Sequence, residues 1–147
     1  MDDSISKSLS KLRLSSKRLN KLTDQANQTV KEVEKFLEDC SLGVYATVPI
    51  KSWEVGCGEE FFTCLEYCRV GSRYRIAITS GLDNSDPSEH HVKPWSDASR
   101  DEKLESIKKL PDLIAEIGKL VDEKIVSAEI GLGEVSEALN ELSGREG

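Results

Sequence analysis

The sequence contains no run of apolar residues approaching the roughly 20 that a membrane-spanning helix requires. Its first residues, Met-Asp-Asp-Ser-Ile-Ser-Lys, also lack the basic segment, apolar core and cleavage site of a secretory signal. We therefore expect a cytoplasmic protein without a membrane span. Because the cytosol keeps thiols reduced, the cysteines are expected to be free; they are Cys40, Cys57, Cys64 and Cys68.

The sequence also lacks the motifs that mark common enzyme sites. It has no glycine-rich phosphate loop, no serine nucleophile elbow and no His-Glu-x-x-His zinc motif. Its 147 residues suit a single domain, residues 1–147, and 37 % hydrophobic with 32 % charged residues is typical of a globular protein. We therefore predict a protein without catalytic activity, without a cofactor and without a metal.

Neither proline nor glycine occurs between Ser4 and Asp39, where apolar residues recur every three or four positions. This spacing predicts a long N-terminal helix over residues 1–39 with one apolar stripe. The helix would be about 50 Å long, longer than a compact domain of this size is wide, so it must protrude, pair with another helix or break. The stripe consists of Ile5, Leu9, Leu12, Leu19, Leu22, Ala26, Val30, Val33 and Leu37.

The net charge of −7 is unevenly distributed along the chain. Residues 1–31 contain seven basic and three acidic residues, a net charge of +4. Residues 32–79 contain five and eight, a net −3, and residues 80–147 contain eight and sixteen, a net −8. An acidic total argues against a nucleic-acid partner, and no aromatic residue precedes Phe36 on which a base could stack. The asymmetry favours attraction between the terminal helices.

Two segments that alternate in polarity flank Gly71-Ser72, a pattern typical of a β-hairpin with a two-residue turn. The turn fixes the register, so that Tyr67 pairs with Ile76. One face then carries Leu65, Tyr67, Tyr74, Ile76 and Ile78. The opposite face carries Glu66, Cys68, Arg73, Arg75 and Thr79, with Glu66 and Arg75 close enough to form an ion pair.

A further strand is predicted over Val44–Ile50, where Pro49 indicates a sheet edge or a strand end. Residues 51–60 either extend this strand or form another, with a turn or bulge at Gly56-Cys57-Gly58. Residues 43–80 therefore form a three-stranded, or four-stranded, antiparallel meander.

Residues 81–98 are rich in Asp, Asn, Ser and Pro without a period, which predicts a loop. Ser99 and Glu102 then have the spacing of a capping box. The region 99–142 carries a regular apolar stripe through Ile114, Val121, Ile125, Leu132 and Leu142, but its proline and glycines predict three helices, 99–110, 111–130 and a last one to 142, with a kink or restart at Pro111. The fold class is α+β, with both terminal helical regions covering one face of the sheet.

The cysteines and His90-His91 are the residues most suited to a metal or nucleophilic site. Cys64 and Cys68 would lie about 13 Å apart along one strand, too far to bind one ion together. Cys57 lies between two glycines without a signature for a catalytic thiol. We therefore expect inert thiols and solvated histidines.

Trp53 and Trp95 are the most informative apolar residues outside the periodic segments. Trp95 precedes a helix cap, where an aromatic ring usually packs on the core. An exposed Trp would instead mark a contact surface. The sequence favours the core position for both.

These observations favour a small protein–protein interaction module that acts through its helical surface or its open sheet face, with a homodimer formed through the C-terminal stripe. The residues of the expected interaction surface are Glu66, Cys68, Arg73, Arg75, Trp53 and Trp95. One alternative is a ligand-binding or enzymatic pocket between the Glu66/Arg75 face and the 80–98 loop. Another is an acidic inhibitor or decoy that binds a basic partner, suggested by the −8 of residues 80–147.

Overall fold

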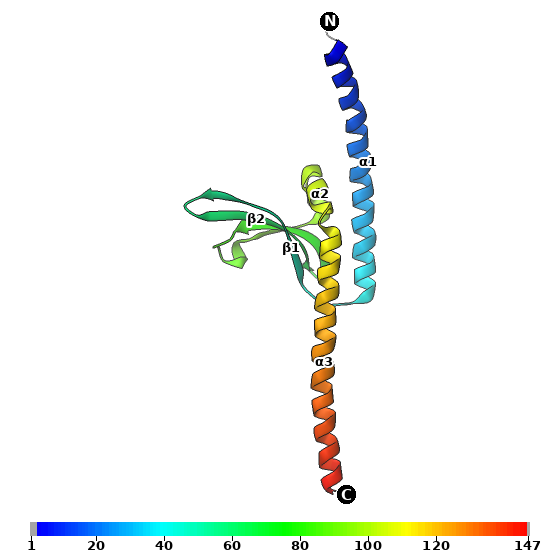
Figure 1. The fold of residues 1–147 in the computed structure, drawn as a ribbon, viewed down its shortest axis with the longest axis vertical. Helices are drawn as coiled ribbons and strands as arrows, with labels where there is room; N and C mark the ends of the chain where they lie inside the picture. The colour runs from blue at the N-terminus through cyan, green and yellow to red at the C-terminus, as the bar shows by residue number, and fades with distance from the viewer. Residues whose placement is uncertain (1–2, 147) are drawn as a thin grey trace.

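The computed structural model describes residues 3–146 and has an α+β fold, as predicted (Figure 1). Residues 1, 2 and 147 of the predicted 1–147 domain lie outside the described part. The elements follow the order α1 (Asp3–Cys40), β1 (Ala46–Gly56), β2 (Glu59–Val70), β3 (Arg73–Leu82), η1 (Pro87–Glu89), β4 (His91–Pro94), η2 (Trp95–Asp97), α2 (Arg100–Ile107) and α3 (Leu110–Glu146).

The sheet is an antiparallel meander of four strands in the order β1-β2-β3-β4. The predicted hairpin register is confirmed: Tyr67 pairs with Ile76 and Val70 with Arg73, around Gly71 at φ +67°. The fourth strand, however, is β4, in the segment that we predicted as a loop. It pairs with β3 only over Ala77–Ser80, and a four-residue strand is too short to show periodicity in the sequence.

Residues 51–60 extend β1 and begin β2 rather than adding a strand. The chain reverses through Cys57 and Gly58, and Gly56, Cys57 and Gly58 all have positive φ values, which confirms the predicted turn. β1 is an edge strand, as Pro49 indicated, and its register shifts between Pro49 and Lys51. The β1–β2 hairpin projects away from the helices (Figure 1).

The core lies between one sheet face and the inner parts of α1 and α3. Leu65, Tyr67, Ile76 and Ile78 are buried in it, as predicted for that face. α1 contributes Ala26, Val30 and Leu37, whereas α3 contributes Leu110, Leu113 and Ile117. The outer parts of both helices contribute no residue to this core.

The C-terminal region differs from the three helices that we predicted. The capping box is confirmed, because Ser99 caps α2 and Glu102 reciprocates, but α2 ends at Ile107. Pro111 lies in the first turn of α3, so the helix restarts there, as the sequence predicted. It does so without strain, because the amide that proline lacks has no partner within the helix at that position. α3 then continues as a single helix through Gly118, Gly131, Gly133 and Gly144.

α1 and α3 run in the same direction along the longest axis of the molecule (Figure 1). With 38 and 37 residues, they are each about 55 Å long. They overlap only beside the sheet, so the N-terminal part of α1 extends beyond the body at one end and the C-terminal part of α3 extends beyond it at the other. We call residues 3–22 the α1 arm and residues 122–145 the α3 arm.

Candidate interaction site

The α1 arm exposes the outer half of an apolar stripe that begins in the core. Ala26, Val30 and Leu37 are buried, and the same helical face continues outward past α2, whose Arg100 donates to Asn20 Oδ1 at 3.3 Å, into residues that are increasingly exposed. Leu9 is 61 % exposed and Leu12 63 % exposed. The exposed apolar residues of the arm are Ile5, Leu9, Leu12, Leu14, Leu19 and Leu22.

The α3 arm is more exposed still, because every residue from Asp122 to Arg145 is solvent-exposed. Leu132, at 69 %, is the most exposed of its large apolar side chains. The others are Ile125, Val126, Ile130, Val135, Leu139 and Leu142. Monomeric soluble proteins rarely expose an apolar surface this extended, and such a surface usually marks an interaction site.

The stripe that the sequence predicted on α3 is not the face that packs on the sheet. The buried face carries Leu110, Leu113 and Ile117, whereas the predicted stripe passes through Ile114, which is 45 % exposed. One residue along a helix corresponds to a rotation of about 100°. The stripe therefore lies beside the sheet-packing face. Its Val121 still packs against the core, whereas its large apolar residues from Ile125 onward are exposed.

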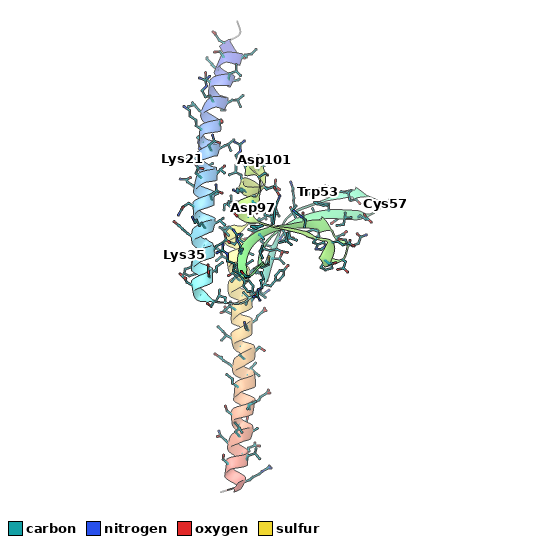
Figure 2. The ribbon with its side chains drawn as sticks, turned by 180° about the vertical axis from the view of Figure 1, so that it is seen from behind. Lys21, Lys35, Trp53, Cys57, Asp97 and Asp101 are labelled. Carbon is teal, nitrogen blue, oxygen red and sulfur yellow. The ribbon has the colours of Figure 1, made fainter. Side chains whose placement is uncertain are left out.

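The two arms carry opposite charges. The α1 arm has six Lys or Arg and one Asp, a net +5. The α3 arm has six Asp or Glu and two Lys or Arg, a net −4. Figure 2 shows the side chains of both arms pointing outward from the two helices, with α2 lying beside α1 near Lys21.

The glycines of the α3 arm weaken it as an isolated helix. Gly131 and Gly133 each cost about 1 kcal/mol relative to alanine in a helix interior, and Gly144 lies in the last turn. Nothing lies within 4 Å of a Cβ built at any of the three, so the fold does not require glycine there. Most of the stability of a helix in a protein comes from packing of its apolar face, so contact with another surface would stabilise this arm.

The predicted open sheet face is not open around Glu66, which is buried. Tyr45 donates its hydroxyl to Glu66 Oε1 at 2.8 Å, and Thr79 donates to Oε2 at 2.8 Å. Burial and the nearby Glu66 carboxylate raise the pKa of the Cys68 thiol to about 11, so it stays protonated at neutral pH. A cleft of about 580 Å³ nevertheless lies between this cluster and Pro87 and His90, where we predicted the alternative ligand pocket.

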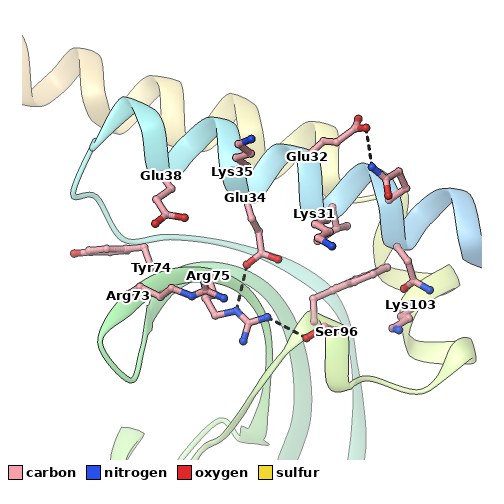
Figure 3. Close-up of a pocket in the computed structure, with 14 residues that line it drawn as sticks. Lys31, Glu32, Glu34, Lys35, Glu38, Arg73, Tyr74, Arg75, Ser96 and Lys103 are labelled. Atoms are coloured by element: carbon pink, nitrogen blue, oxygen red, sulfur yellow. Dashed lines mark hydrogen bonds and ion pairs between the residues drawn. The ribbon is translucent and has the colours of Figure 1, made fainter.

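The predicted ion pair between Glu66 and Arg75 is wrong. Arg75 instead extends over the free edge of β3, where its Nε lies 3.4 Å from Glu34 Oε2 of α1 (Figure 3). The same oxygen accepts the Ile76 amide at 3.2 Å, and Arg75 also donates to Ser96 Oγ at 3.0 Å. These contacts attach α1 to the sheet along one side of a cleft of about 730 Å³ that Arg73 also lines.

The two tryptophans have different environments. Trp95 is buried and donates its indole N–H to Ser106 Oγ at 2.8 Å, which confirms the predicted core position. Trp53 is 42 % exposed on the projecting hairpin, so its predicted core position is wrong (Figure 2). Its ring packs on Phe61 at 5.0 Å beside a cleft of about 360 Å³ closed by α2.

The cysteines and histidines do not converge on one site. Within residues 3–146, no group of three His, Cys, Asp or Glu side chains could hold a metal ion. His90 lies against Phe62 with its Nε2 3.3 Å from the Leu82 carbonyl, whereas Cys57 is exposed at the hairpin turn. Across the same residues, no helix is both long and apolar enough to cross a membrane.

Comparisons with protein-family models, curated proteins and solved structures found no significant match.

Proposed function

We propose that this protein is a non-catalytic interaction module that binds another polypeptide through its two helical arms. The observation that carries this proposal is the exposed apolar stripe on each arm, continuing along helices whose inner parts build the core. Burying a large aliphatic side chain fully contributes about 1.5–3 kcal/mol, so several half-exposed side chains on each arm are sufficient for stable association.

A helical partner fits the arms better than a membrane or a nucleic acid. The apolar residues of the stripe recur every three or four positions. This spacing forms the ridges that pack into the grooves of another helix. The acidic α3 arm would repel both phosphate groups and anionic lipids. The basic α1 arm offers no aromatic side chain for base stacking.

The ligand-pocket and decoy hypotheses stay predictions. Tyr45 and Thr79 each already donate to one carboxylate oxygen of Glu66, so a ligand in the adjoining cleft would have to share these oxygens with them. A decoy function would require only the acidic α3 arm, and it gives no role to the apolar α1 arm.

Amine-reactive cross-linking in the native host, read by mass spectrometry, tests the proposed function. We expect Lys7, Lys11 and Lys17 of the α1 arm to be cross-linked to a second polypeptide, whatever its identity. The double variant Leu9→Asp/Leu12→Asp should lose these cross-links, because charged groups cannot be buried against an apolar partner.

The matched control is Ser6→Asp/Ser10→Asp, which adds the same charge on the opposite face of the same arm, where both serines are exposed, and it should retain most of the cross-links. The proposed function is wrong if the wild-type arm forms cross-links neither to a different protein nor, in a mixture of ¹⁵N-labelled and unlabelled chain, to a second copy. It is also wrong if both double variants behave alike.

A further inference from the structure

We infer that the polypeptide bound by the arms is a second copy of this chain, with the α1 arm of each copy packed antiparallel against the α3 arm of the other. This inference rests on the proposed function and adds the identity of the partner and the geometry of the complex.

Charge selects this pairing among those that two identical copies offer. An α1 arm at +5 beside an α3 arm at −4 gives attraction, whereas α1 with α1 or α3 with α3 brings like charges together. Helices pack about 8–10 Å apart, comparable to the distance over which physiological salt screens charge, so the net charges of facing helices still interact. The predicted attraction between terminal helices then acts between copies, because within one copy the arms lie at opposite ends.

The arrangement of α1 and α3 fits a closed two-fold dimer. Both helices run in one direction, with their arms at opposite ends (Figure 1). A two-fold axis perpendicular to that direction exchanges the ends, so the α3 arm of the second copy lies beside the α1 arm of the first, and the reverse holds at the other end. The ends of the two helix macrodipoles that meet are then of opposite sign.

The lengths of the arms and the extent of their contact also suit such a dimer. The α1 arm spans about 30 Å and the α3 arm about 36 Å, so the longer can cover the shorter as far as Asn20, which accepts a hydrogen bond from Arg100 of α2. A strip about 30 Å long and 10 Å wide on each of four arms gives about 1,200 Å² in total, at the lower end of stable interfaces.

Reversing the charge of one arm at a time tests the pairing. Variant A carries Lys11→Glu, Lys17→Glu and Arg18→Glu, and variant B carries Glu134→Lys, Glu137→Lys and Glu141→Lys. All six residues are exposed. We expect the wild type to have twice the 16.3 kDa chain mass by light scattering. Each variant alone should show at least a tenfold higher dissociation constant at low salt, with a smaller difference at high salt.

Mixing the variants is the decisive step. In an A–B pair, both arm contacts again join opposite charges, so an equimolar mixture should recover the dimer, and so should one chain carrying all six substitutions. Recovery also shows that neither variant is misfolded. If only variant B is affected, the copies pair through α3 alone and the inference is wrong. It is also wrong if neither variant changes the mass, or if the wild-type mass grows without limit, since that indicates an open chain of copies.

Carbodiimide coupling in a 1:1 mixture of ¹⁵N-labelled and unlabelled chain tests the direction of pairing. Mixed-isotope links should join Lys7 and Lys11 to Glu137 and Glu141. Links from these lysines to Asp122 and Glu123 would show parallel arms and overturn the two-fold arrangement. If the wild type is monomeric while the α1 arm is cross-linked to a different polypeptide in cells, this inference fails and the proposed function stands.

Discussion

At the scale of single residues, Glu66 is the side chain whose environment differs most from what the sequence implied. The register predicted its strand neighbours correctly, but not that Tyr45, which precedes β1, reaches its carboxylate. Arg75 pairs with Glu34 because the free edge of β3 leaves the Ile76 amide facing α1, and one carboxylate serves both groups. The register of a hairpin predicts which residues of its two strands are neighbours. It does not predict which residues of other elements contact them.

Replacing Glu66 by alanine is expected to lower the free energy of unfolding by about 2–3 kcal/mol. The substitution leaves the buried Thr79 hydroxyl without its charged acceptor, and it also removes the acceptor of the more exposed Tyr45 hydroxyl. Urea denaturation measures the loss. Glu54→Ala, on the exposed part of β1, is the matched control and should change stability little. Equal effects of the two variants would contradict the structural role of Glu66.

At the scale of elements, the sequence predicted those with strong periodicity or clear turn chemistry and missed those without them. α1, the Gly71-Ser72 hairpin and the Ser99 cap follow from local patterns. β4 is too short for a pattern and depends on pairing with β3. The predicted break before Pro111 is present, but the predicted break after residue 130 was wrong. Intrinsic propensity penalises Gly131 and Gly133, yet it predicts less than the long apolar stripe does.

Glycine-to-alanine substitutions should have opposite signs in α3 and in the hairpin. Gly133→Ala, at a helical position with open space around its Cβ, should strengthen the α3 arm by about 1 kcal/mol. Amide hydrogen exchange across residues 122–146 should therefore slow. Gly71→Ala places a side chain at φ +67° and should destabilise the protein by about 1 kcal/mol. Faster exchange in Gly133→Ala would show that the arm is not helical in solution.

At the scale of the whole molecule, the α+β architecture could be predicted, but the placement of its surfaces could not. The sequence shows two apolar stripes and a sheet with one apolar face. It does not show that α3 packs on the sheet through Leu113 and Ile117 while the more regular stripe stays exposed. Both faces of α3 have helical spacing, so only the three-dimensional packing distinguishes them.

Shortening the chain should separate the body from the α3 arm. A chain that ends at residue 121 retains every buried core residue, so it should keep the cooperative unfolding transition and the blue-shifted fluorescence of buried Trp95. A chain that ends at residue 109 lacks Leu110, Leu113 and Ile117 and should lose both. Similar behaviour of the two chains would show that α3 is dispensable for the core.

The position of these three residues in the chain also bears on synthesis at the ribosome. All four strands have been synthesised once Pro94 has left the ribosome. The apolar face of the sheet, however, stays partly uncovered until Ile117 of α3 has also been synthesised. At about 5–20 residues per second, that interval lasts about one to five seconds, long enough for a nascent sheet to meet a chaperone or a neighbouring chain.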